Sequence, residues 1–207
     1  MSDRTIEVML VDDHALVRSG FRRMLEDEED IRIVGEASDG HEAVAMAASV
    51  RPDVVVMDFA LPSMNGAVAT RRILAANPTV KVLILSMHAE AAYVRTCLDA
   101  GARAYLLKNA MDLELVDAVR QVFRGEQVLD PRLGVIGPGE TRSLSTRELE
   151  VLQLIVHGKS NKDIAVMLSL SVNTISVHRA NIMQALEIHN TAELVVYAIR
   201  QGLVSIA

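Results

Sequence analysis

The sequence contains a single cysteine, Cys97, and this scarcity excludes any protein held together by intramolecular disulfides. The six histidines show no spacing typical of a zinc site. No P-loop and no glycine-rich dinucleotide loop occurs. No apolar run reaches the length that crosses a membrane, and we expect no signal peptide before the first strand. We therefore expect a cytoplasmic protein that makes no contact with a membrane.

The second half of the chain lacks an excess of positive charge. The whole sequence has 21 Lys and Arg against 27 Asp and Glu, a net charge of -6. From Leu144 onward the five basic residues (Arg147, Lys159, Lys162, Arg179, Arg200) balance five acidic ones (Glu148, Glu150, Asp163, Glu187, Glu193). Residues 1–143 therefore carry the whole negative charge, which suits a cation site. The neutral C-terminal part would be attracted only weakly to a nucleic acid by charge alone.

Strand and helix signals alternate through the first 124 residues. Continuous apolar runs, typical of strands that helices cover on both faces, occur at 6–11, 31–35, 53–57, 81–85 and 103–107. Helical stretches lie between and after them, at about 14–27, 40–50, 66–76, 89–99 and 111–124. Five such β–α units predict an α/β fold with a doubly wound, five-stranded parallel sheet.

The pattern changes after Arg124. Glycine and proline without sustained periodicity occupy 125–143, which we interpret as a linker. Only helical signals follow, at about 146–157, 161–168, 172–186 and 191–203, and the short gap between the second and third suits a helix-turn-helix. The predicted organisation is an α/β domain over 1–124, a linker over 125–143 and a small all-α domain over 144–207.

Polar side chains follow the predicted strands at their carboxyl ends, where ligands bind in open parallel sheets. Asp12 and Asp13 close the first strand, Asp58 the third, Ser86 the fourth and Lys108 the fifth. Magnesium prefers such oxygen ligands. We expect Asp13 and Asp58 to bind Mg²⁺ directly and Asp12 to bind it through water. A backbone carbonyl just after Asp58, that of Ala60, would complete the protein ligands. Lys108 and Ser86 would contact a phosphoryl group on Asp58.

In these residues the chain resembles a two-component response regulator. The match comprises the acidic pair, Met57-Asp58, Pro62, Met64-Asn65-Gly66, Ser86 and Lys108, in the order and approximate spacing of a flavodoxin-like receiver domain. The resemblance covers about residues 5–124. It implies that Asp58 is the phosphoacceptor and that Ser86 and Tyr105 are switch residues. Asn109 departs from the proline that many receivers have after the lysine.

The last segment resembles a LuxR-type, or NarL/FixJ-type, helix-turn-helix. The similarity runs from Leu144-Ser145-Thr146 through Gly158-Lys159-Ser160-Asn161 and Val172-Asn173-Thr174-Ile175 to Ala192-Glu193-Leu194. Thr146 stands where that family usually has proline, a mild change at the start of a helix.

Helix geometry separates two faces of the predicted recognition helix. Ile175, Ile182 and Leu186 share the face that should pack against the other helices. The opposite face would enter the major groove, where Asn and Gln can read adenine and Val can contact a thymine methyl. The residues expected to contact DNA are Asn173, Thr174, Ser176, Val177, Ala180, Asn181 and Gln184 for the bases, and Lys159, Lys162 and Arg179 for phosphates. The reading face itself carries no charge, so we expect weak binding by a monomer.

The leading interpretation is a transcription factor switched by phosphorylation, and not an enzyme beyond its own phosphorylation and dephosphorylation. A sensor histidine kinase would phosphorylate Asp58, the protein would form a homodimer, and the helix-turn-helix would bind double-stranded DNA. One alternative is an aspartyl-phosphate hydrolase or phosphotransferase. Those that resemble haloacid dehalogenases need a second acid two residues after the nucleophile, and that position is Ala60. Another alternative is a phosphorelay or scaffolding protein whose helical domain binds protein.

Overall fold

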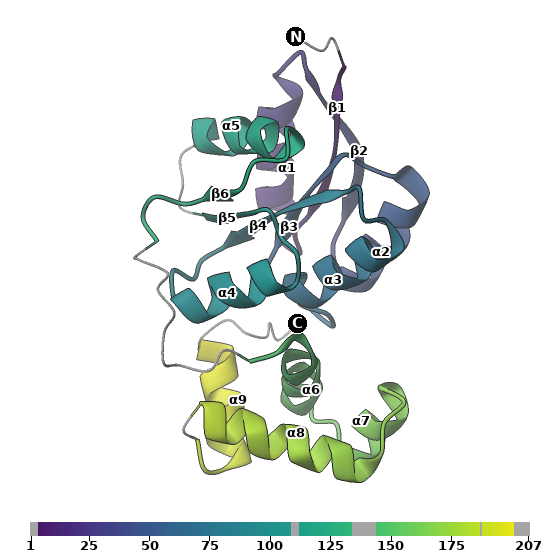
Figure 1. Ribbon diagram of the computed structural model, residues 1–207, viewed down its shortest axis with the longest axis vertical. Coiled ribbons are helices and arrows are strands. Elements are labelled where there is room, and N and C mark those ends of the chain that lie inside the picture. Colours follow the sequence, from purple (N-terminus) through teal and green to yellow (C-terminus); the bar gives the residue numbers. More distant parts are fainter. Residues whose placement is uncertain (1–3, 109–111, 134–143, 187, 201–207) are drawn as a thin grey trace.

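The computed structural model describes residues 4–108, 112–133, 144–186 and 188–200 (Figure 1). The α/β part consists of β1 (Ile6–Val11), α1 (Ala15–Glu26), β2 (Ile31–Ala37), α2 (Gly40–Val50), β3 (Val54–Asp58), α3 (Gly66–Ala76), β4 (Lys81–Ser86), α4 (Ala91–Asp99), β5 (Ala104–Leu107), α5 (Asp112–Phe123) and β6 (Val128–Leu129). The helical part consists of α6 (Thr146–Val156), α7 (Asn161–Met167), α8 (Val172–Ala185) and α9 (Thr191–Arg200). None of the described helices is long and apolar enough to cross a membrane.

In the described residues the sheet has six parallel strands in the order β2-β1-β3-β4-β5-β6, so the predicted count of five is wrong by one. The additional strand, β6, lies within the segment that the sequence assigns to a linker. It pairs Val128 with Ala104 and Leu129 with Tyr105 of β5. Two residues are too few to show a periodic pattern, so the sequence cannot reveal a strand that forms only by pairing with β5.

Both faces of the sheet are buried, which explains the continuous apolar runs. Val8, Val54 and Leu83 point to one face, where they meet α1 and α5. Met9 and Val55, their neighbours along the strands, point to the other face, which α2, α3 and α4 cover. The two helical layers appear on opposite sides of the sheet in Figure 1.

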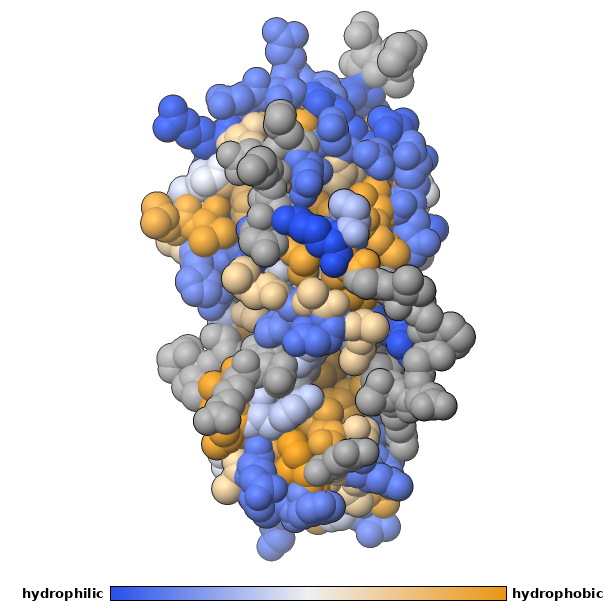
Figure 2. Space-filling model, turned by 90° about the vertical axis from the view of Figure 1, so that its left-hand side faces the viewer, coloured by the Kyte–Doolittle hydropathy of each residue, from blue (hydrophilic) through white to orange (hydrophobic). Residues whose placement is uncertain are grey.

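The helical domain packs against α3 and α4, and its apolar core is continuous with that of the α/β domain. Leu149, Leu152 and Ile164 belong to this shared core. In Figure 1 the helical domain lies directly beneath α3 and α4. Figure 2 shows that hydrophilic residues cover the end of the α/β domain farthest from the helical domain, whereas apolar patches lie nearer to the middle of the molecule.

Serine side chains begin three of the four helices that are described in the helical domain. Ser145 forms a capping box with Glu148 at the start of α6. Ser160 forms the same arrangement with Asp163 at α7. The side chain of Ser171 caps α8 by accepting a hydrogen bond from the backbone N–H of Thr174.

Asp130, directly after β6, ties the end of the α/β domain to its sheet. Its buried carboxylate accepts hydrogen bonds from the backbone N–H of Leu107 at 2.9 Å and from the guanidinium of Arg132 at 2.6 Å. Burial alone would raise the pKa of Asp130, but these donors outweigh burial and hold the pKa below its usual value of 3.8. The carboxylate therefore stabilises the fold above that pH.

We expect Asp130→Asn to lower the free energy of unfolding by about 1–3 kcal/mol at neutral pH, because buried donors lose a charged acceptor. The difference from wild type should shrink as the pH falls through the lowered pKa of Asp130, where the native carboxylate is protonated. Urea unfolding at several pH values measures both effects. Asp99→Asn, an exposed acid at the end of α4, is the control and should change stability little.

Candidate functional site

Three carboxylates meet at the carboxyl ends of β1 and β3, as the sequence predicts. Asp12 and Asp58 are buried, and Asp13 is half-buried. One ligand atom from each of Asp12, Asp13, Asp58 and His14 lies within 4.8 Å of the others. Oxygen atoms predominate in this set, so the site fits Mg²⁺ better than a metal that prefers nitrogen or sulfur.

His14 is a further member of this cluster, although the histidines show no spacing typical of a zinc site. Its Nδ1 lies 2.7 Å from Oδ1 of Asp13 and 3.5 Å from Oδ1 of Asp12. The signal available in the sequence was its position directly after the acidic pair. The cluster shows no regular spacing in the sequence, because one of its members, Asp58, comes from the end of β3.

Lys108 reaches the same cluster from the end of β5. Its Nζ lies 2.7 Å from Oδ2 of Asp58 and 2.9 Å from Oδ2 of Asp12. Burial raises the pKa of Asp58, and the nearby Asp12 carboxylate raises it further, while Lys108 opposes both. Burial works against the charge of Lys108, but Asp58 and Asp12 outweigh burial and raise the pKa of Lys108. The lysine thus remains a cation next to the proposed phosphoacceptor.

The loop of residues 59–65, between β3 and α3, folds back over Asp58. The backbone N–H of Ala60 donates to Oδ1 of Asp58 at 3.1 Å, and that of Gly66 donates to the carbonyl of Phe59 at 2.9 Å. A Cβ at Gly66 would lie 2.3 Å from the backbone oxygen of Asp58, so only glycine allows this approach. The side chain of Asn65 caps α3 by accepting from the backbone N–H of Val68 at 3.0 Å.

The structure places both expected switch residues beside this site, in the buried core. Ser86 ends β4, and its Oγ accepts a hydrogen bond from the backbone N–H of His88 at 3.1 Å. The ring of Tyr105 is fully buried, and its hydroxyl donates to the carbonyl of His88 at 2.8 Å. Burial raises the pKa of Tyr105. Both side chains thus contact the segment that follows β4.

The helix-turn-helix of α7 and α8 presents a polar, uncharged face. Ile175 and Ile182 are fully buried against the other helices. Val177 is 53% exposed on the opposite face. The expected base-contacting residues Asn173, Ser176, Ala180 and Gln184 are also exposed, while Thr174 and Asn181 are half-buried.

The three expected phosphate-contacting residues differ in their surroundings. Lys159 and Lys162 are exposed near the start of α7. The guanidinium of Arg179 donates to Oδ1 of Asn161 at 3.1 Å and to Oγ1 of Thr191 at 2.8 Å, which joins α8 to α7 and α9. Arg179 therefore links the helices of the domain to one another.

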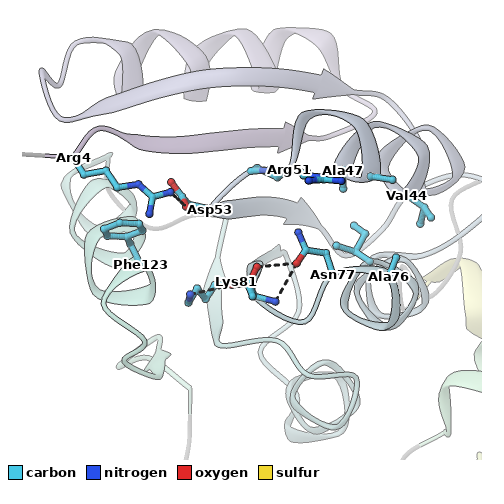
Figure 3. Close-up of a pocket in the computed structure, with 13 residues that line it drawn as sticks. Arg4, Val44, Ala47, Arg51, Asp53, Ala76, Asn77, Lys81 and Phe123 are labelled. Carbon is cyan, nitrogen blue, oxygen red and sulfur yellow. Dashed lines mark hydrogen bonds and ion pairs between the residues drawn. The ribbon is translucent and has the colours of Figure 1, made fainter.

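A separate hollow of about 710 Å³ lies at the opposite, amino-terminal edge of β3 and β4 (Figure 3). Arg4 lies over the ring of Phe123 there and forms an ion pair with Asp53 at 2.7 Å. Asp53 also accepts from the backbone N–H of Glu7 at 3.1 Å. These charged groups satisfy one another, so we assign the chemistry to the carboxylate cluster at the other edge.

Two family models match the chain at these two places. Residues 8–120 match the response regulator receiver domain, and residues 142–198 match the bacterial regulatory proteins of the luxR family. The chain therefore belongs to the response regulators that join a receiver domain to a LuxR-type DNA-binding domain, and it is a transcription regulator of the NarL/FixJ type.

Particular relatives and solved structures match between 62% and 96% of the chain. The oxygen regulatory protein NreC of Staphylococcus carnosus is 39% identical over 96% of this chain and 99% of its own. The structure of a LuxR-family response regulator from Aurantimonas sp. is 37% identical with a TM-score of 0.61, covering 62% of this chain and 92% of that one. The structure of RcsB from Salmonella enterica serovar Typhimurium bound to the promoter P1flhDC is 25% identical with a TM-score of 0.73, covering 95% of this chain and all (100%) of that one.

Proposed function

We propose that Asp58 accepts a phosphoryl group from a partner sensor histidine kinase and that this controls DNA binding through α8. The observation that carries the proposal is the position of Asp58, which is buried between two further carboxylates and Lys108 at the carboxyl edge of the sheet. A carboxylate that attacks a phosphoryl group needs positive charge nearby to offset the negative charge of both groups. The acidic cluster can bind a metal cation, and Lys108 supplies a fixed positive charge.

The carboxylates of Asp13 and Asp58, with the carbonyl of Ala60, would hold Mg²⁺ directly, and Asp12 would hold it through water. When bound, Mg²⁺ offsets the negative charge of the phosphoryl group and of the attacking carboxylate. An oxygen of Asp58 forms the new P–O bond while the bond from phosphorus to the imidazole nitrogen of the kinase breaks, and that nitrogen keeps the electron pair. Lys108 then pairs with one phosphoryl oxygen and Ser86 donates to another.

The helical domain supports the DNA-binding half of the proposal. The exposed Asn173 and Gln184 can form paired hydrogen bonds with adenine, and the exposed Val177 can contact a thymine methyl. Lys159 and Lys162 would contact phosphates at the edge of the groove.

Genome-wide DNA binding tests the proposal as a whole. We expect wild-type protein to occupy specific sites when its kinase is active, and Asp58→Ala to lose that occupancy although its helical domain is unchanged. If neither wild type nor Asp58→Ala occupies specific DNA sites, the result would favour the scaffold alternative, in which the helical domain binds protein. Equal occupancy by both proteins would show that DNA binding does not depend on Asp58.

We expect Asp13→Ala to weaken Mg²⁺ binding by about tenfold or more and to leave the fold intact. The substitution removes a charged ligand, and it also relieves the repulsion among three neighbouring acids. Calorimetric titration with MgCl₂ measures the affinity, and thermal unfolding checks the fold. Asp99→Ala removes one negative charge far from the cluster and should bind as wild type does. Equal affinity in Asp13→Ala and wild type would remove Asp13 from the metal ligands.

A further inference from the structure

One polar side chain of the helical domain enters the loop that follows the proposed phosphoacceptor. Gln153, on α6, is only 2% exposed. Its Nε2 donates to the carbonyl of Leu61 at 3.2 Å, and its Oε1 accepts from the backbone N–H of Asn65 at 3.1 Å. The side-chain amide therefore bridges two backbone groups of loop 59–65, and neither bond involves another side chain.

Loop 59–65 is also the segment that organises the proposed metal site. Ala60 lies one residue before Leu61, its N–H donates to Asp58, and its carbonyl is the expected backbone ligand. At the other end of the loop, Gly66 packs against the backbone of Asp58. The loop is thus fixed to Asp58 on one side and to Gln153 on the other. The same short loop thus provides a direct physical connection through which one set of contacts can influence the other.

Two further polar contacts between the described parts of the domains do not involve this loop. Arg72 of α3 forms an ion pair with Glu150 of α6 at 2.8 Å. Thr96 of α4 donates to the carbonyl of Leu144 at 3.3 Å. These contacts join the domains through α3 and α4 and not through loop 59–65. A variant that breaks one of them is therefore a suitable control for a variant of Gln153.

We propose that Gln153 is a positioning residue for the phosphorylation site. Through its two hydrogen bonds the DNA-binding domain holds loop 59–65 in place, and this raises the affinity of the site for Mg²⁺. The inference rests on the proposed function of Asp58. By reciprocity, Mg²⁺ at the site strengthens the docking of α6 on the loop. Such docking is compatible with DNA binding, because the exposed reading face lies on α8 and not on α6.

The test compares full-length wild type with Gln153→Met, which keeps a long, helix-favouring side chain and removes both hydrogen bonds. Arg72→Ala, which breaks the ion pair with Glu150 and leaves the Gln153 contacts, is the matched control. The chain has no tryptophan, so calorimetry is suited to measure the Mg²⁺ affinity. Labelling by acetyl phosphate over a range of Mg²⁺ concentrations gives the second readout. Gln153→Ala replaces the methionine variant if melting curves show that the latter does not fold.

We expect the Mg²⁺ dissociation constant to rise at least about threefold in Gln153→Met and to stay unchanged in Arg72→Ala. Labelling of Gln153→Met should be slower at low Mg²⁺ and should reach the wild-type rate at saturating Mg²⁺, a pattern that loss of stability alone does not produce. Unchanged or tighter Mg²⁺ binding in Gln153→Met would overturn the proposal, as would an equal loss in Arg72→Ala. Wild type that neither binds Mg²⁺ nor becomes labelled would instead refute the proposed function itself.

Discussion

Asp58→Asn is expected to lose all labelling by acetyl phosphate and Mg²⁺. The amide has almost the same shape as the carboxylate but lacks the charge and the nucleophilic oxygen that form the acyl phosphate. Lys108 keeps Asp12 as a partner at 2.9 Å, so the lysine does not become an unpaired buried charge. The loss should therefore reflect chemistry and not unfolding.

Mass spectrometry and acid lability of the bound phosphate measure this effect. Asp99→Asn is the control, since it removes the charge of an exposed acid that lies far from the cluster. Undiminished acid-labile phosphate on Asp58→Asn, with its melting temperature near that of wild type, would show that another residue is the phosphoacceptor.

Binding of phosphorylated protein to DNA is expected to need two half-sites. The reading face of α8 has no charge, and the acidic receiver opposes approach to the duplex. A second copy doubles the contacts and binds at a high effective concentration. We expect half-sites about one helical turn apart, and a loss of affinity of about 100-fold when one half-site is scrambled.

Gel shifts with the two operators, together with the mass of the complex, measure the requirement. Val177→Ala and Asn181→Ala should alter sequence preference. Lys159→Ala and Lys162→Ala should lower affinity for all sequences and reduce the salt slope by about one for each phosphate contact. Equal affinity for both operators, with one copy of the protein in the complex, would contradict the dimer.

The apolar runs and the polar residues that end them predicted most of the fold and the carboxylate cluster. A parallel sheet brings the carboxyl ends of its strands to one edge, so Asp12, Asp58 and Lys108 had to lie close together once the strands were recognised. These positions could therefore be predicted without knowing any side-chain contact.

The features that the sequence missed depend on contacts between distant segments. Strand β6 exists because Val128 finds a partner on β5, and its two residues carry no pattern of their own. Gln153 lies on a helix whose period is clear, but its partners are the backbone groups of Leu61 and Asn65, which no pattern of side chains can indicate. The hydrogen bonds of Arg179 to Asn161 and Thr191 depend on three separate helices and become visible only when these are assembled.

In the proposed function, the receiver and the DNA contact different helices of the same small domain. Glu150 and Gln153 of α6 contact the receiver, whereas Asn173, Val177 and Gln184 of α8 face outward. Substitutions on the outward face can therefore accumulate without loosening the contact that links it to the receiver. If the proposed function holds, operator preference can diverge while signal input is retained, and a recognition helix from a related regulator should function when grafted onto this chain.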